Sequence, residues 1–275
     1  MKNILVADSG ATKTDWAIGT QRFTTQGISP IHQDDDTILA ILREELLPRI
    51  AGITVDAVHF YGSGVRPEQE ERLAGLLKSL PLSPSKRGGT LLVGSDLLGA
   101  ARALLGHEEG IACILGTGAN SGLYDGNNIV QNTPPLGYIL GDEGSGAVLG
   151  RLLLNGLYKG RLPSALRQAF EEEMGLTLSE VIDHVYRQPM PSRWLASLSP
   201  FVHRHLDVPE VEQMVTDNFR AFLRLNIAPY RRPDLPVNAV GSIAYYYRPQ
   251  LQQAAEAEGC QLGRILKSPI DSLAV

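Results

Sequence analysis

Apolar residues recur along the chain in short runs that predict strands, and these runs alternate with longer stretches that predict amphipathic helices. Residues 2–27 predict three strands, the first of them the apolar run Ile4-Leu5-Val6-Ala7. Further elements are then predicted up to residue 105: helices 37–50, 67–80 and 97–105, and strands 57–61 and 91–93. Strands that alternate with helices indicate an α/β fold.

The opening plan of strand, small-residue turn and strand occurs a second time. Residues 111–115 form an apolar run that ends in a turn at 116–122, as the first strand ends in Ser9-Gly10-Ala11-Thr12. This repeat predicts an internal duplication of architecture. With a joint between Gly106 and Gly110, we expect one lobe at 1–107 and a second at 108–275.

The rest of the second lobe divides into a helical part and a final strand–helix–strand pattern. Residues 162–228 are mainly helical in pattern and predict an insertion. A strand at 237–240, a helix at 243–258 and a strand at 264–267 follow.

The first turn carries candidate chemistry. Its backbone N–H groups can wrap phosphate oxygens as a nest, and Thr12 and Lys13 add a hydroxyl and a cation. Asp8, at the end of the strand, is placed to hold a hydrated Mg²⁺ beside those phosphates. The alternative interpretation is a β-hairpin with an acid in its turn.

Three later positions each allow two interpretations. Asp96 either caps the helix that follows it or is a reactive carboxylate at a strand end, where a helix N-terminus favours the ionised form. Asp142, in the glycine-framed run Gly141-Asp142-Glu143-Gly144-Ser145, is either a ligand-binding acid or a helix cap. Gly241-Ser242, between a strand and a helix, either receives an adenosine or phosphate edge or is a tight turn.

Composition narrows the class of protein. The net charge of -5 argues against a nucleic-acid-binding surface. The two cysteines, Cys113 and Cys260, lie far apart and form no CxxC motif, which disfavours structural zinc. The sequence shows no signal peptide and no apolar run of about 18 residues, so we expect a cytoplasmic protein with no membrane contact.

Four stretches, taken in order, resemble the actin-like ATPase and sugar-kinase superfamily, and most of all its N-acetylglucosamine kinase and BadF/BadG-type ATPase family. They are Asp8-Ser9-Gly10-Ala11-Thr12-Lys13-Thr14, Leu115-Gly116-Thr117-Gly118-Ala119-Asn120, Gly141-Asp142-Glu143-Gly144-Ser145 and Val240-Gly241-Ser242. The resemblance implies two ribonuclease-H-like lobes that hold ATP and Mg²⁺ in the cleft between them.

The resemblance also implies a role for each matching residue. Asp96 would take the proton from the 6-hydroxyl of a sugar, and Asp8 would orient Mg²⁺. The residues implied to bind the nucleotide are Gly10, Thr12, Lys13, Gly116, Thr117, Gly241 and Ser242. The residues implied to bind the sugar are Ser29, Ser63, Asp96, Ala119, Asn120, Gly137 and Asp142.

Two departures from the family pattern fall at sugar-contacting positions. Ser29-Pro30 stands where the family often has Asn-Pro, and Pro135-Leu136-Gly137 stands where some members have Gly-Trp-Gly. The chain also lacks the cysteine pair of the BadF-type activators. We therefore expect an ATP-dependent kinase of an N-acetylated amino sugar, compatible with a homodimer, with a sugar or nucleotide sensor or a partner-coupled ATPase as the alternatives.

Overall fold

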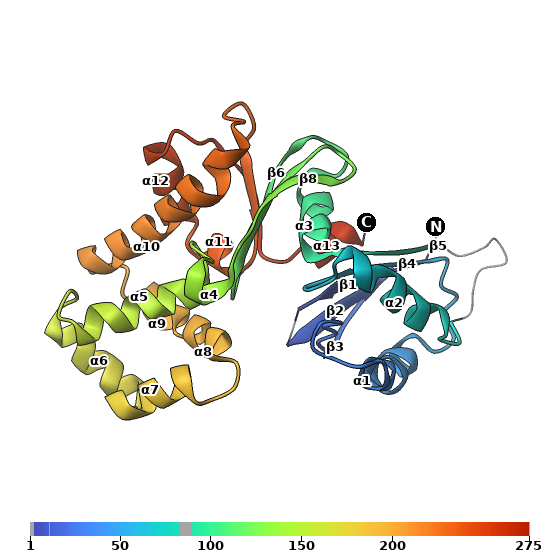
Figure 1. Ribbon diagram of the computed structural model, residues 1–275, viewed down its shortest axis with the longest axis horizontal. Coiled ribbons are helices and arrows are strands. Elements are labelled where there is room, and N and C mark those ends of the chain that lie inside the picture. Colours follow the sequence, from blue (N-terminus) through green and yellow to red (C-terminus); the bar gives the residue numbers. More distant parts are fainter. Residues whose placement is uncertain (1–2, 11, 83–89, 275) are drawn as a thin grey trace. The chain divides into compact units, whose positions relative to one another are not determined.

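The chain forms two compact units, each built around its own β-sheet (Figure 1). The structure is a computed structural model that describes residues 3–10, 12–82 and 90–274. Unit 1 comprises Met1–His107 together with Ser268–Val275, and unit 2 comprises Glu108–Lys267. Ala11 of the predicted phosphate turn lies outside the described residues.

The sheet of unit 1 has five strands in the order β3-β2-β1-β4-β5. The strands are β1 (Ile4–Ser9), β2 (Lys13–Ile18), β3 (Gln21–Gln26), β4 (Ala57–Gly62) and β5 (Thr90–Ser95). The first three form an antiparallel meander, whereas β4 and β5 run parallel to β1. The first four residues of the central strand β1 are apolar because helices cover both faces of the sheet, and Asp8 and Ser9 follow at its carboxyl end.

The sheet of unit 2 has the same plan, with the order β10-β9-β6-β7-β8. Its strands are β6 (Gly110–Leu115), β7 (Ala119–Tyr124), β8 (Ile129–Thr133), β9 (Val237–Val240) and β10 (Leu262–Leu266). Again the first three strands are antiparallel and the last two run parallel to the first. The predicted duplication of architecture and the α/β class are thus confirmed.

Helices complete each unit. In unit 1 they are α1 (Asp35–Ile41), which continues into η1 (Leu42–Leu46) and η2 (Leu47–Ile50), α2 (Pro67–Lys78), α3 (Asp96–Leu105) and α13 (Ile270–Leu273). In unit 2 they are α4 (Gly137–Leu140), α5 (Gly146–Tyr158), α6 (Ser164–Met174), α7 (Leu178–Tyr186), α8 (Pro191–Ser197), α9 (Ser199–Arg204), α10 (Pro209–Phe222), η3 (Leu223–Ile227), η4 (Ala228–Tyr230), α11 (Ser242–Tyr246) and α12 (Arg248–Ala257). None of these described helices is long and apolar enough to cross a membrane.

The structure differs from the sequence prediction in the helix that follows β9 and at the end of the chain. The single helix expected over 243–258 is two helices, α11 and α12, because Pro249 restricts the backbone of the preceding residues. The chain end expected in the second lobe packs in unit 1, where Ile270 joins a cluster with Val6 and Tyr61. This apolar contact accounts for the return of the chain.

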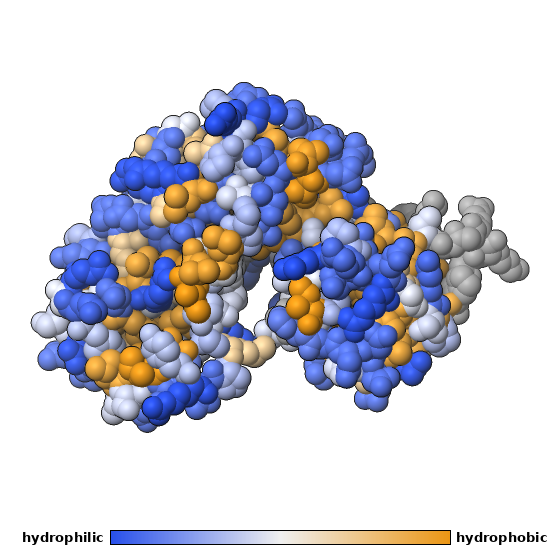
Figure 2. Space-filling view, viewed as in Figure 1, coloured by the Kyte–Doolittle hydropathy of each residue, from blue (hydrophilic) through white to orange (hydrophobic). Residues whose placement is uncertain are grey.

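Each unit has its own hydrophobic core. In unit 1 the larger cluster contains Leu5, Trp16 and Phe60 and lies between the sheet and helices α1 and α2. In unit 2 one cluster extends from β6 through α5 to α10 and α12, with Phe219 and Leu251 fully buried. On the face shown in Figure 2 the surface is mostly hydrophilic, and its hydrophobic residues form separate patches.

Candidate functional site

The carboxyl ends of three neighbouring parallel strands meet at one edge of the sheet in unit 1. Ser9 of β1 pairs with Gly62 of β4, which in turn pairs with Ser95 of β5. The next residue after β4 is Ser63, and the next after β5 is Asp96. The register therefore brings Asp8, Ser63 and Asp96 to the same edge, where ligands of open α/β sheets bind.

Asp96 is the first residue of α3, and Ser95 rather than Asp96 caps the helix. The Ser95 hydroxyl accepts from the N–H of Leu98, so the capping interpretation of Asp96 is wrong. The Asp96 carboxylate instead accepts from the N–H of Leu97 at 2.8 Å and from the hydroxyl of Ser63. Burial raises the pKa of Asp96, and these hydrogen bonds partly oppose the rise.

Asp8 lies in an unfavourable electrostatic environment for a carboxylate. Burial raises its pKa to about 7, and the negative charges of Asp96 and Asp15 add to the rise, while Lys13 opposes it. A cation beside Asp8 would relieve this repulsion. Among the described residues, no three histidine, cysteine or acidic side chains are grouped to hold a metal by themselves. Asp8 is thus suited to a cation that takes its other ligands from water or phosphate.

The β1–β2 turn places the predicted phosphate residues of unit 1 at the tip of a hairpin. The Gly10 N–H donates to the Lys13 carbonyl at 2.9 Å, which closes the turn, and the Thr12 side chain is exposed. The Lys13 ammonium forms an ion pair with Asp15 at 2.6 Å. Lys13 would therefore have to leave or share Asp15 to reach a phosphate.

Ser29 is buried, with 6% of its surface exposed, where the chain leaves β3. The amide of Gln33 fixes this segment, because its oxygen accepts from the Ser29 N–H and its nitrogen donates to the Gly27 carbonyl. The guanidinium of Arg72 donates to the carbonyls of Pro30 and Gln33. The segment is thereby held close to the end of β1, where Ser9 bonds the backbone of Ile28.

In unit 2 the β6–β7 turn contacts the start of two helices. The carbonyls of Gly116 and Thr117 accept from the first N–H groups of α5, those of Gly146 and Ala147. A Cβ at Gly241 would lie 2.2 Å from the carbonyl oxygen of Leu115, and the φ of Gly241 is 125°. The structure therefore needs glycine at 241, where the turn before α11 meets the β6–β7 turn.

Asp142 connects the same turn to the segment that bears Gly137. Its carboxylate accepts from the backbone N–H groups of Ala119 and Gly137, and a Cβ at Gly118 would lie 3.1 Å from it. Burial nevertheless raises the pKa of Asp142 to about 6, helped by the charge of Glu143. Ser145, not Asp142, caps α5 by accepting from the N–H of Val148, so the capping interpretation of Asp142 is wrong.

The remaining predicted residues of unit 2 lie around this arrangement. The Asn120 amide oxygen accepts from its neighbouring Ser121 N–H and from the side chain of Asn132, both at 2.9 Å. Thr117, Gly137 and Ser242 are exposed to solvent. Backbone contacts and the Asp142 carboxylate thus connect six predicted residues within unit 2: Gly116, Thr117, Ala119, Gly137, Asp142 and Gly241.

Asn218 is a supporting residue that the sequence interpretation missed. It is buried on α10, and its amide oxygen accepts from the N–H of Gly144 at 3.0 Å. Gly144 has a φ of 80°, and a Cβ there would lie 2.9 Å from the Cβ of Phe222, the last residue of α10. The signal was present, because an asparagine follows Val211 and Val215 on the apolar face of a predicted helix.

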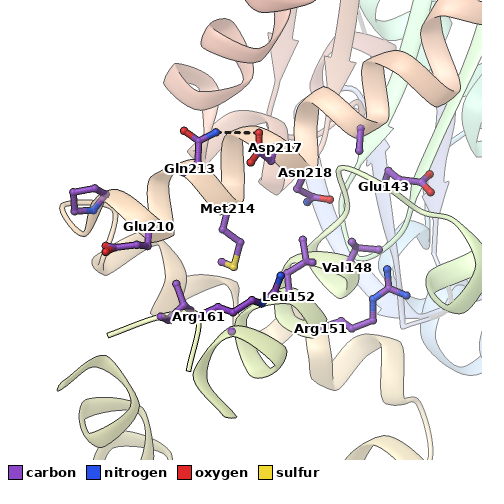
Figure 3. Close-up of a pocket in the computed structure, with 14 residues that line it drawn as sticks. Glu143, Val148, Arg151, Leu152, Arg161, Glu210, Gln213, Met214, Asp217 and Asn218 are labelled. Carbon is purple, nitrogen blue, oxygen red and sulfur yellow. Dashed lines mark hydrogen bonds between the residues drawn. The ribbon is translucent and has the colours of Figure 1, made fainter. Parts of the chain in front are cut away.

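A cavity of about 720 Å³ lies beside Asn218, between α5 and α10 (Figure 3). Val148, Leu152 and Met214 form an apolar floor, and Arg151, Arg161, Glu210 and Asp217 supply charges around it. Glu143 is at one end, where its carboxylate accepts from Asn226 at 3.2 Å. None of the predicted site residues lines this cavity. Helix α10 contacts the Gly141–Ser145 loop through Asn218, which accepts from the N–H of Gly144.

Comparison with solved structures identifies the family. A candidate N-acetylglucosamine kinase from Porphyromonas gingivalis is 48% identical, over 98% of this chain and 97% of that chain, with a TM-score of 0.93. The chain belongs to the N-acetylglucosamine kinase family. The resemblance of the four sequence stretches to N-acetylglucosamine kinases is thereby confirmed.

More distant structures share the fold of the family. A candidate N-acetylglucosamine kinase from Chromobacterium violaceum is 21% identical over 100% of this chain and 98% of that chain, with a TM-score of 0.74. A candidate N-acetylmannosamine kinase from Listeria monocytogenes is 15% identical over 99% and 97% of the two chains, with a TM-score of 0.51. Neither the models of protein families nor the curated proteins give a match.

Proposed function

We propose that the protein transfers the γ-phosphoryl group of ATP to the 6-hydroxyl of an N-acetylated amino sugar. The observation that carries this proposal is the meeting of Asp8, Ser63 and Asp96 at one sheet edge of unit 1. Membership of the N-acetylglucosamine kinase family supports the same reaction class. Phosphoryl transfer needs positioned phosphates, a cation and a group that receives the hydroxyl proton.

Asp96 is proposed as the general base. A base works best when its pKa lies near the working pH, and burial raises the pKa of Asp96 in that direction. The hydroxyl of Ser63 and the N–H of Leu97 fix the orientation of the carboxylate. In the proposed complex, Asp96 would accept the proton of the 6-hydroxyl while the sugar oxygen bonds to the γ-phosphorus, and the bond from that phosphorus to the β–γ bridging oxygen would break to release ADP.

Asp8 is proposed to hold Mg²⁺ through water. The cation would neutralise charge on the phosphate oxygens during transfer. The raised pKa of Asp8 fits this role, because a carboxylate surrounded by Asp96 and Asp15 gains most from a positive neighbour. Within the chain, Lys13 is the residue that lowers this pKa.

The two glycine turns are proposed to bind the phosphates of ATP. Gly10, Thr12 and Lys13 would contact them from unit 1. Gly116, Thr117, Gly241 and Ser242 would contact them from unit 2, where the two turns touch. The sugar is proposed to bind Ser29 and Ser63 of unit 1 and Ala119, Asn120, Gly137 and Asp142 of unit 2.

A phosphorylation screen tests this proposal directly. The protein is incubated with ATP and Mg²⁺ and with single amino sugars, amino-sugar acids or plain hexoses, and ³¹P NMR identifies the product and the ester position. We expect a 6-phosphate of an N-acetylated amino sugar. ATP hydrolysis that is independent of any sugar would instead favour a partner-coupled ATPase, and sugar binding without transfer would favour a sensor. Either result would overturn the kinase proposal.

A further inference from the structure

The backbone of Ser29 is fully bonded within the protein, whereas its hydroxyl is available to a ligand. The Ser29 N–H donates to the amide oxygen of Gln33, and the Ser29 carbonyl accepts from the N–H groups of His32 and Gln33. Among the described residues the hydroxyl of Ser29 has no hydrogen-bond partner. A hydroxyl without a protein partner, on a residue that is mostly buried, is a group that a polar ligand can satisfy.

Side chains hold the segment of residues 27–33, because it forms neither helix nor strand. The Gln33 amide closes the segment on itself, with bonds of 2.8 Å from the Ser29 N–H and 2.9 Å to the Gly27 carbonyl. Arg72 of α2 adds bonds of 2.6 Å to the Pro30 carbonyl and 2.8 Å to the Gln33 carbonyl. These two side chains are called the Arg72–Gln33 clamp here.

The third nitrogen of the Arg72 guanidinium is also bonded to the protein. Its Nε donates to the carboxylate of Asp35 at 2.6 Å. Each of the three guanidinium nitrogens therefore has a partner in the segment or at the start of α1. A planar fork of donors can hold three acceptors in one geometry, whereas a lysine ammonium on a flexible stem cannot.

The same segment packs against the turn that bears Ser63. A Cβ at Gly64 would lie 2.9 Å from the terminal carbon of Ile31, so the Ile31 side chain lies directly against the Gly64 backbone. Gly64 follows Ser63, whose hydroxyl bonds the carboxylate of Asp96. The position of the segment therefore fixes the position of Ser29 relative to Ser63 and Asp96.

We propose that the Arg72–Gln33 clamp positions Ser29 for the sugar and thereby determines how tightly the sugar binds. This inference rests on the proposed function and adds two positioning residues to it. Both residues act through the backbone of the segment, and neither needs to touch the sugar. Without the clamp, the unpaired hydroxyl of Ser29 would no longer be held at a fixed place beside the turn of Ser63.

Binding and kinetic measurements on the full chain test the clamp. Calorimetry would give the Kd for N-acetylglucosamine and for ATP in the wild type, Arg72→Lys, Gln33→Met and the double variant. We expect each single substitution to raise the Kd and the KM for the sugar by about tenfold, because one hydrogen bond to the ligand is lost. The Kd for ATP should stay within about twofold, which also shows that the variants are folded.

The double variant tests whether the two residues act together. Both single substitutions release the same segment, so their combined effect on the sugar Kd should be clearly smaller than the product of the single effects. A combined effect equal to that product would show that the residues act independently and would overturn the clamp. Unchanged sugar affinity in both single variants would also overturn it, as would an equal loss of sugar and ATP affinity, which indicates a merely structural role.

Two control variants leave the clamp intact. Asp35→Asn removes the exposed ion pair of Arg72 but keeps its bonds to the two carbonyls, so it should change the sugar Kd by no more than about twofold. Arg43→Lys makes the same replacement at an exposed position of η1 and should have no effect. A tenfold loss in Asp35→Asn would assign the effect to the ion pair and overturn the clamp.

The binding measurements also separate this inference from the proposed function. A wild type that binds N-acetylglucosamine, and loses sugar affinity in Arg72→Lys, but phosphorylates no sugar would overturn the proposed function and leave the clamp standing. A wild type that phosphorylates the sugar with the same KM as Arg72→Lys and Gln33→Met would overturn the clamp and leave the proposed function standing.

Discussion

Asp142 offers a sharp test of the site in unit 2, because its charge opposes stability while the proposed function uses it. The substitution Asp142→Asn removes the charge and keeps the shape. Asparagine also tolerates the φ of 54° found at this position. One oxygen remains to accept from the N–H of Ala119 or Gly137, so the change loses about 0.5–1.5 kcal/mol of hydrogen bonding.

Removal of the Asp142 charge has the opposite effect on the free energy of unfolding, and the size of this effect depends on pH. The folded state raises the pKa of Asp142 from 3.8 to about 6, so it binds the proton more tightly than the unfolded state does. The free energy of unfolding therefore falls as pH rises from 3.8 to 6, and stays lower above that range. The full shift corresponds to about 3 kcal/mol. Because the carboxyl is only half-buried, solvent screening reduces this to about 1–1.5 kcal/mol.

Two measurements follow from these magnitudes. Urea unfolding of the wild type and Asp142→Asn at pH 7 should give free energies within about 1 kcal/mol, because the two terms nearly cancel. At pH 4 the wild type should gain about 1 kcal/mol relative to the variant, since its carboxyl becomes protonated. The comparison between variants cancels the titration of all other groups. An identical pH dependence in both proteins would show that the pKa of Asp142 is not raised.

The same variant separates two roles of Asp142 in the proposed reaction. If the carboxylate binds sugar hydroxyls, the variant should raise the KM for sugar by tenfold or more while the KM for ATP stays nearly constant, because charge-assisted hydrogen bonds are lost. Asp125, an exposed acid in the β7–β8 turn that accepts only local backbone bonds, provides the control Asp125→Asn. An unchanged sugar KM with a greater Mg²⁺ requirement would refute the sugar role and favour a metal role.

Three further predictions concern the base and the turns. Asp96→Asn should lower kcat by about 10²–10⁴ while ATP affinity, measured by calorimetry, stays constant; near-normal turnover would remove Asp96 from the role of base. Thr117→Val should raise the KM for ATP several-fold with little change in Tm, because the side chain is exposed; an unaltered KM would place the phosphates elsewhere. Gly241→Ala should destabilise unit 2 by about 2 kcal/mol or more in urea unfolding, because its Cβ would lie 2.2 Å from the oxygen of Leu115; a stable variant would contradict the observed turn.

The strands and most helices could be predicted because their signals are local. An apolar run followed by Gly, Ser or Asp predicts both a strand and the place where it ends. The run at residues 4–7 is followed by Asp8, and the run that ends at Leu115 is followed by Gly116. The cap of α3 could not be assigned in this way, since Ser95 and Asp96 are both good capping residues. Only the extended backbone of Ser95, with φ -69° and ψ 156°, decides between them.

Non-local packing explains what the sequence pattern did not predict. Ile270 returns to unit 1 because Val6 and Tyr61 leave an apolar surface for it, which no periodicity within residues 268–274 indicates. The apolar helix face around Asn218 indicates that this side chain is buried, but no local pattern indicates its partner, Gly144, which lies 74 positions away in the sequence. By contrast, the break between α11 and α12 had a local signal in Pro249.

The two units place different residue types at equivalent positions of one architecture. Their sheets have equivalent strand orders, so the end of β4 corresponds to that of β9, and Gly62-Ser63 corresponds to Gly241-Ser242. The ends of β5 and β10 differ, because Asp96 follows the first and Lys267 follows the second. Acidic groups thus accumulate at the sheet edge of unit 1, where their mutual repulsion and burial raise the pKa of Asp8.

At the corresponding edge of unit 2 the sheet itself supplies neutral glycine turns, and the carboxylate comes from the Asp142 loop outside the sheet. A neutral turn can accept the charge of a polyphosphate without repulsion, whereas an acidic edge can hold a cation and remove a proton. In the proposed reaction, the residue types at equivalent strand ends would therefore decide which part each edge serves, with the cation and the base at the edge of unit 1 and the phosphates at the turns of unit 2.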